Sequence, residues 1–260
     1  MSIRTVNVMR YVTPLREGGS LPAIIEADDD GLYVLKFRGA GQGLKALVAE
    51  LLSGEIARHL GLRVPEIVFA TLDRELSRLE PDPEIQDLLR ASAGSNLAMD
   101  FLPGSMTFDP VVETVDAQLA SQIVWLDALI TNVDRTARNT NILMWHKNLW
   151  LIDHGASLFF HHAWQNWEEQ SRRPFTQIKD HVLLRSATEL DAVDDNLKAR
   201  LTGDVIGKIV DLVPDEWLAD ELQLRSVAEK RMVYKTFLQN RIEQSRVFVE
   251  EAQRAREASV

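Results

Sequence analysis

The chain has 260 residues, of which 45% are hydrophobic and 26% charged, so it can bury a core in one large domain or in two lobes. It contains no cysteine, which excludes disulfides, thiolate catalysis and cysteine-ligated zinc. The formal net charge of -10 argues against a broad nucleic-acid-binding face, and without an apolar run of membrane length or a signal pattern we expect a cytoplasmic protein with no membrane span.

The first third of the chain predicts a β-rich unit. Apolar runs and alternations predict strands over residues 5–12, 23–27, 32–37 and 68–72. Between the first two strands stand Gly18, Gly19 and Ser20, a stretch whose backbone amides can approach phosphate oxygens without side chains in the way. An ordinary hairpin turn has the same composition, so the stretch is compatible with both a phosphate cover and a simple turn.

The strand over residues 32–37 carries one charged side chain, Lys36, whose compact ammonium can reach nucleotide phosphates. Apolar residues then recur at helical spacing over residues 39–60. Glu50 falls at the edge of this apolar face, where a carboxylate could pair with Lys36 and hold the ammonium in place. Glu55 is the competing acid and lies further round the helix. We expect Glu50 to be the partner, while a solvent-facing strand lysine is the simpler alternative for Lys36.

A further strand leads from Asn96 into a turn at Gly104, after a short helix around residues 85–89. The backbone groups of Asp100, Phe101 and Leu102 could meet the edge of a nucleotide base there, although a connecting loop explains the same residues. We expect a boundary between two lobes near residue 103.

The middle of the chain contains the pattern on which the functional interpretation depends. Helical spacing over residues 117–130 is followed by a polar loop, residues 132–141, with the sequence NVDRTARNTN. Two short apolar runs then predict a hairpin that ends at Asp153. Asp127 lies close to the apolar face of the helix, and we expect its carboxylate to hold the neighbouring loop by hydrogen bonds.

Asp134, Asn139 and Asp153 are the polar residues with a chemical interpretation. A loop aspartate can accept or orient a hydroxyl proton, while the asparagine and the second aspartate offer hard oxygen ligands to magnesium on nucleotide phosphates. Each of these residues alone would be a weak signal. Their combination on a helix, a loop and a hairpin indicates a phosphoryl-transfer site, with a purely structural loop as the alternative.

The pattern Asp134-Arg135-x-x-x-Asn139 followed by Asp153-x-Gly155 resembles the HipA-like kinases and, more distantly, the phosphatidylinositol 3/4-kinases. The resemblance implies an α+β, two-lobed protein-kinase-like fold. A small β-rich N-lobe would span residues 1–103, and a larger, mainly helical C-lobe would span residues 104–260. It also implies ATP and Mg2+ as cofactors.

The same resemblance assigns roles to individual residues. Asp134 would be the catalytic base or hydroxyl-positioning acid, and Asn139 and Asp153 the metal ligands. Lys36 would contact the phosphates with Glu50 as its orienting partner. The stretch from Gly18 to Ser20 would cover the phosphates.

The acceptor stays open at this level. The resemblance implies a protein serine or threonine, including self-phosphorylation. Aminoglycoside and choline kinases share the Asp, Asn and Asp pattern but usually have His-Gly before the loop aspartate, where this chain has Asn132-Val133. Inositide kinases typically have histidine at the position of Thr136, which weakens a lipid acceptor. A non-catalytic nucleotide-binding module and a nucleotidyl transferase are further alternatives.

The C-terminal half is expected to be mainly helical. We expect the pair His161-His162 to have a surface or capping role rather than to bind zinc, because adjacent side chains point in different directions. Trp164 and Trp167 are expected to be packing anchors. The apolar stripe over residues 226–258 predicts one long final helix.

Overall fold

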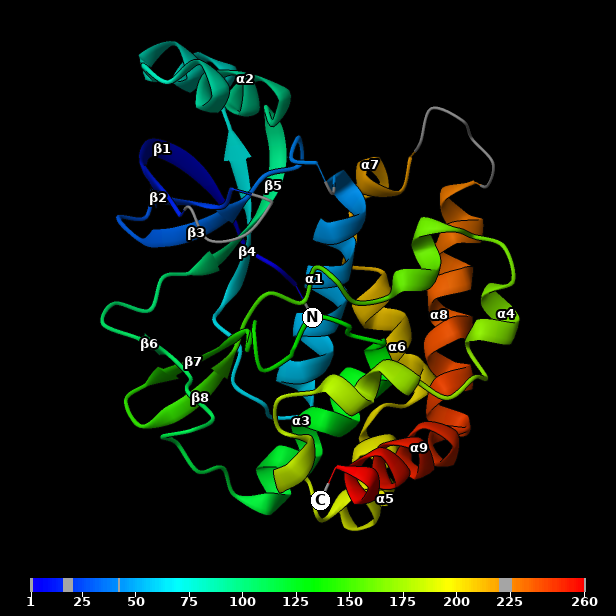
Figure 1. Ribbon diagram of the computed structural model, residues 1–260. Coiled ribbons are helices and arrows are strands. Elements are labelled where there is room, and N and C mark those ends of the chain that lie inside the picture. The colour runs from blue at the N-terminus through cyan, green and yellow to red at the C-terminus, as the bar shows by residue number, and fades with distance from the viewer. Residues whose placement is uncertain (1, 16–20, 42, 220–225, 260) are drawn as a thin grey trace.

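Five N-terminal strands close into a barrel in the computed structural model, which describes residues 2–15, 21–41, 43–219 and 226–259 (Figure 1). The strands, in spatial order, are β1 (Thr5–Pro14), β2 (Ala23–Ala27), β3 (Leu32–Lys36), β5 (Gly94–Asp100) and β4 (Ile67–Leu72). Neighbours are antiparallel except β1 and β4, which pair in parallel and close the barrel. Along β3, Tyr33 and Leu35 are buried in the barrel core, so Lys36 leaves the strand on the opposite face.

Helix α1 (Gly43–His59) lies between this barrel and the C-terminal helices (Figure 1). Residues 47–57 are buried on all sides, because α1 contacts β4 and β5 on one side and α6 and α7 on the other. A β-carbon at Gly54 would stand 2.5 Å from Ile67 Cδ1. Because residue 54 is a glycine, α1 can lie directly against β4. This close packing fixes the position of Glu50 relative to β3.

Two short helices cover one end of the barrel, and after β5 the chain enters a second, three-stranded sheet. The short helices η1 (Arg74–Leu79) and α2 (Pro83–Ala91) cap the far end of the barrel, and the three strands β6 (Met106–Thr107), β7 (Ile142–Trp145) and β8 (Asn148–Leu151) form the second sheet. The change of sheet between β5 and β6 is compatible with a lobe boundary near residue 103, which stays a prediction.

The second half packs around α3 (Ala117–Ile130), whose bounds match the predicted helix. The other described elements there are η2 (Phe159–His162), α4 (Trp167–Gln170), η3 (Thr176–Asp180), η4 (Leu184–Ser186), α5 (Leu190–Arg200), α6 (Gly203–Val210), α7 (Asp215–Leu218), α8 (Val227–Glu243) and α9 (Ser245–Ala258). One continuous apolar core joins α1, α3 and these helices. Trp125 of α3 is fully buried against Phe248 of α9, with ring centroids 5.5 Å apart.

The prediction of one long final helix is wrong. The chain turns at Gln244, which ends α8 and begins α9. Arg241 explains part of this arrangement, because its side chain donates to the carbonyls of Ala128 and Leu129 at 2.6 and 2.7 Å. These carbonyls belong to the last turn of α3, so the guanidinium caps that helix. Its positive charge also interacts favourably with the negative end of the helix dipole. A straight continuation of α8 would carry Phe248 away from α3.

The expected surface or capping role of the pair His161-His162 is wrong for His161, because this residue is buried in the core. It hydrogen-bonds through Nδ1 to the Tyr234 hydroxyl at 2.9 Å, whereas His162 is exposed. Trp164 packs edge-on against Phe160 and Tyr234, as expected for a packing anchor. Within the described ranges no group of three or more histidines and acids could hold a metal ion, and no helix is long and apolar enough to cross a bilayer.

Candidate active site

Lys36, at the end of β3, is held between two carboxylates. Its Nζ donates to Glu50 Oε2 at 2.7 Å and to Asp153 Oδ1 at 2.6 Å. The Glu50 side chain is 0% exposed, that of Lys36 is 15% exposed and that of Asp153 is 48% exposed. The competing acid, Glu55, lies beside Arg58 instead, at 3.4 Å. The barrel, α1 and the loop after β8 therefore meet at one ammonium group.

Opposite charges keep this group ionised despite its burial. Burial by itself would lower the pKa of Lys36, but the carboxylates of Glu50 and Asp153 outweigh it and raise that pKa above its ordinary value. Burial would likewise raise the pKa of Glu50, and the Lys36 charge with a hydrogen bond from His154 holds it well below its ordinary value. At neutral pH the site thus contains a fixed positive charge whose direction is set by a buried carboxylate.

The second oxygen of Glu50 has a partner that the sequence did not predict. His154 Nδ1 lies 3.2 Å from Glu50 Oε1, and both side chains are fully buried. His154 follows Asp153 directly in the chain. The loop after β8 thus contacts the Lys36 and Glu50 pair through two consecutive side chains.

The loop after α3 brings Asp134 and Asn139 together. Asn139 Nδ2 donates to Asp134 Oδ2 at 2.8 Å, and the half-buried Asp134 is also held by the Asn132 side chain, which accepts from its backbone N–H at 3.1 Å. Asn141 Nδ2 donates to the Asp134 carbonyl at 3.1 Å. With the Asn139 amide in this orientation, its carbonyl oxygen remains available to a ligand.

Asp127 and Arg135 form the buried support of this loop. Arg135 Nε donates to Asp127 Oδ2 at 2.5 Å, and both side chains are 0% exposed. His181 Nε2 and Asn132 Nδ2 each lie 2.9 Å from the same carboxylate. Burial would raise the pKa of Asp127, but the Arg135 charge and the His181 contact hold it well below its ordinary value. The predicted role of Asp127 as a loop anchor is confirmed.

The chain leaves β8 through a left-handed residue, Asp153, whose φ is 55°. The Ile152 N–H donates to the Asn141 carbonyl at 3.0 Å, which ties the end of β8 to the loop after α3. Arg135 also donates to the Asn141 carbonyl and so supports the same junction. The turn directs the Asp153 side chain back toward Lys36. A methyl group at Gly155 would meet only ordinary contacts, such as Ala46 Cβ at 3.6 Å, so steric crowding does not require that glycine.

The predicted base-binding segment at the end of β5 is partly occupied by the protein itself. The Asp100 N–H donates to the Glu66 carbonyl and the Phe101 N–H donates to the Leu32 carbonyl, both at 2.9 Å. These two N–H donors are therefore unavailable to a nucleotide base, and of the three predicted residues Leu102 is left as the backbone donor. In the part of the chain that the structure describes, the Leu102 N–H has no acceptor. Gly18, Gly19 and Ser20 lie outside the described residues.

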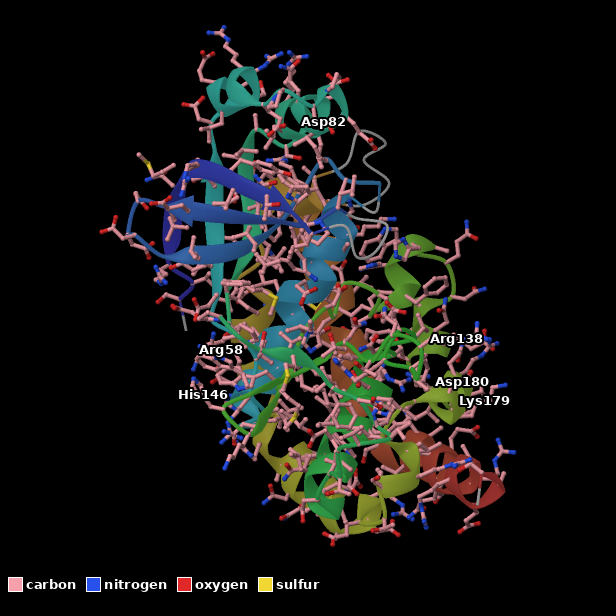
Figure 2. The ribbon with its side chains drawn as sticks, turned by 60° about the vertical axis from the view of Figure 1, so that its left-hand side comes forward. Arg58, Asp82, Arg138, His146, Lys179 and Asp180 are labelled. Atoms are coloured by element: carbon pink, nitrogen blue, oxygen red, sulfur yellow. The ribbon has the colours of Figure 1, made fainter. Side chains whose placement is uncertain are left out.

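The exposed side of the loop after α3 carries two basic side chains, Arg138 and Lys179, and one acid, Asp180. Figure 2 shows Arg138 on the same side of the molecule as Lys179 and Asp180. The backbone joins these segments, since Thr136 forms a bridge with His181 and the Val182 N–H donates to the Arg135 carbonyl at 3.0 Å. Across residues 2–15, 21–41, 43–219 and 226–259, neither Arg138 nor Lys179 forms an ion pair.

Comparison with known proteins identifies the family. The family model described as HipA-like kinase matches residues 8–247. The chain belongs to the HipA-like kinase family. Its fold is similar to the Helicobacter pylori proinflammatory kinase CtkA, at 15% identity and a TM-score of 0.51 over 100% of both chains. It is also similar to the Golgi casein kinase, at 13% identity and a TM-score of 0.52 over 100% of this chain and 75% of that chain. No curated protein matches it.

These comparisons confirm the α+β, two-lobed kinase-like fold expected from the sequence. Sequence reasoning on this HipA-like kinase nevertheless missed what three buried side chains do. Arg135 stands inside the motif, but nothing local indicates that its guanidinium is buried. His154 lies 104 positions from its partner, Glu50, and His181 lies 54 positions from its partner, Asp127. Arg135 lies within a polar loop, so its charge gave no signal of burial, and the two histidines meet partners on other segments of the chain.

Proposed function

We propose that this HipA-like kinase binds ATP with Mg2+ and transfers the γ-phosphoryl group to a serine or threonine hydroxyl of a protein. The observation that carries the proposal is the ammonium of Lys36 between Glu50 and Asp153. A positive charge held at a fixed point by a buried acid is suited to nucleotide phosphates, which are anionic. The Golgi casein kinase, whose fold is similar, has been solved with Mn and ADP bound.

The donor set fits a hard divalent cation. Asp153 uses Oδ1 for Lys36, and the Asn139 amide nitrogen is turned toward Asp134, so carboxylate and amide oxygens remain for a metal. Mg2+ prefers such oxygen ligands together with substrate phosphates. Bound there, the cation would neutralise charge on the phosphates.

The remaining residues would position the reactants. Lys36 would exchange its bond to Asp153 for one to a phosphate oxygen, while Glu50 keeps it in place. Asp134 would accept a hydrogen bond from the acceptor hydroxyl and take its proton as the hydroxyl oxygen bonds to the γ-phosphorus and the bond to the bridging oxygen breaks. ADP leaves with the electrons of that bond. The Leu102 N–H and the stretch from Gly18 to Ser20 are proposed for the base and the phosphates.

A protein acceptor is favoured over a cationic small molecule by the charge on the exposed side of the loop. Arg138 and Lys179 together outnumber the one acid beside them, Asp180, so this side of the loop would repel an aminoglycoside or choline and would tolerate or attract a neutral or acidic peptide. Self-phosphorylation is part of this proposal. The cytoplasmic location and the lack of a nucleic-acid partner stay predictions.

The test is incubation of the purified protein with Mg2+ and ATP, alone and with casein, kanamycin or choline, followed by intact mass. We expect a phosphoryl gain on the protein or on casein, and none with Asp134→Ala. Nucleotide binding without any transfer would instead identify a non-catalytic module, and a nucleotidyl gain would identify the other transferase chemistry. If the protein binds no nucleotide in the presence of Mg2+, the proposed function is wrong.

A further inference from the structure

His154 is a buried polar residue to which the proposed chemistry gives no role. Its side chain is fully buried, as is that of Glu50, and the two lie 3.2 Å apart through Nδ1 and Oε1. The other oxygen of Glu50 is bonded to Lys36 at 2.7 Å. Each oxygen of this buried carboxylate thus has its own partner, one charged and one imidazole.

The direction of the hydrogen bond follows from the charge of Glu50. An ionised carboxylate can only accept, so the Nδ1 of His154 must carry the proton and donate it. In the described part of the chain Nε2 is buried without a hydrogen-bond partner. Among the described residues, the hydrogen bond to Glu50 is therefore what orients the imidazole ring of His154.

Four residues close a ring across three elements. Lys36 on β3 bonds to Glu50 on α1, Glu50 bonds to His154, and His154 is joined by a peptide bond to Asp153, which bonds back to Lys36. The carbonyl of His154 accepts from the Ser157 N–H at 2.9 Å, which holds the loop in its turn. A rotation of the Asp153 loop would therefore pull on Glu50 as well as on Lys36.

We propose that His154 is a positioning residue, whose imidazole N–H fixes the Glu50 carboxylate and thereby couples the Asp153 loop to the orientation of Lys36. The inference rests on the proposed function, since it assigns the Lys36 ammonium to nucleotide phosphates. The competing explanation is that His154 merely fills space in the core. The two explanations predict opposite orders for two substitutions.

The first variant is His154→Phe, which keeps a ring of similar size and loses the donor. The second is His154→Asn, which loses the ring but places an amide nitrogen at the branch position of Nδ1. The matched control is His161→Phe, which makes the same change at another fully buried histidine whose partner is Tyr234 rather than a site residue. Melting temperature, ADP affinity in Mg2+ and turnover are measured on each purified protein.

We expect His154→Phe to weaken ADP affinity and turnover on the order of tenfold, the scale for losing a hydrogen bond that orients a ligating group. His154→Asn should recover most of that loss, and His161→Phe should leave ADP affinity within about twofold of wild type. The reverse order, with Phe tolerated and Asn impaired, would identify a packing role and overturn the proposal. Equal losses in ADP affinity from His154→Phe and His161→Phe would overturn it too.

A double-mutant comparison with Glu50→Gln keeps the test independent of folding effects. If His154 acts through Glu50, adding His154→Phe to Glu50→Gln should weaken ADP binding little further. Additive losses would contradict the proposed path. Wild-type binding separates this outcome from the proposed function, because a wild type that binds no ADP contradicts the function, whereas normal ADP binding by His154→Phe contradicts only the role of His154.

Discussion

The Nζ of Lys36 and the Oδ1 of Asp153 lie 2.6 Å apart, although 117 positions separate the two residues in the sequence. Asp153 neutralises the ammonium from the exposed side, while Glu50 does so from the buried side. An entering phosphate can replace the exposed partner and leave the buried one in place. This asymmetry makes Lys36 the residue whose loss should affect both stability and nucleotide binding.

Lys36→Met should abolish ADP binding and lower the free energy of unfolding by about 3 kcal/mol, because it leaves the Glu50 carboxylate buried without its counter-charge. Urea unfolding and calorimetric ADP titration measure the two effects. The double variant Lys36→Met with Glu50→Gln should recover much of the stability and none of the binding. A double variant as unstable as Lys36→Met would show that the buried charge is not the cause.

Asp134→Asn should leave ADP affinity close to that of wild type and lower turnover by roughly a hundredfold or more, since a positioned proton acceptor contributes at least that much. The amide keeps the size of the carboxylate and an oxygen that can accept from Asn139, so the loop should retain its shape. Turnover is measured by phosphoryl gain in intact mass, and binding by calorimetry. A variant with wild-type turnover would remove Asp134 from the chemistry.

Arg135→Met should lower the free energy of unfolding by about 3 to 5 kcal/mol, the cost of leaving one member of a buried ion pair alone. Asp127 would then remain in the core and keep, among the described residues, His181 and Asn132 as partners. Arg78→Met is the matched control, because it removes the same group from an exposed pair with Glu75 and should change stability by less than about 0.5 kcal/mol. Similar urea midpoints for the two variants would argue against the buried support.

The stability of the protein should fall as the pH drops below about 6.5, the ordinary pKa of histidine. Burial, together with His162 and Lys45, lowers the pKa of His161 well below that value. Between the folded-state and unfolded-state pKa values of His161, the unfolded chain therefore binds a proton that the folded chain does not bind. In that interval this group lowers the free energy of unfolding by about 1.4 kcal/mol for each pH unit of acidification. His161→Phe should flatten the pH dependence of the unfolding free energy between pH 7 and 5. An unchanged slope would mean that other groups produce it.

Local pattern was sufficient for much of this protein. Apolar spacing predicted the bounds of α3, the hairpin of β7 and β8 and the barrel strands, because each signal lies within a few turns or residues of the chain. The motif of Asp134, Asn139 and Asp153 carries the resemblance that implied the kinase-like fold. The structure joins Asn139 to Asp134, and Asp153 to Lys36. Composition alone excluded chemistry that needs cysteine.

The tertiary structure decided which side chains meet. Helical spacing favoured Glu50 over Glu55 as the partner of Lys36, and the structure has that contact, but spacing did not show that α1 is buried on all sides along residues 47–57. That burial depends on how α1 docks against β4 and β5, which is a contact between distant segments. His154 contacts Glu50, which lies 104 positions away in the sequence, and His181 contacts Asp127, which lies 54 positions away. The chain turns at Gln244 because Arg241 and Phe248 pack against α3. Contacts between segments so far apart in the sequence arise only when the whole core forms, so no local pattern of residues predicts them.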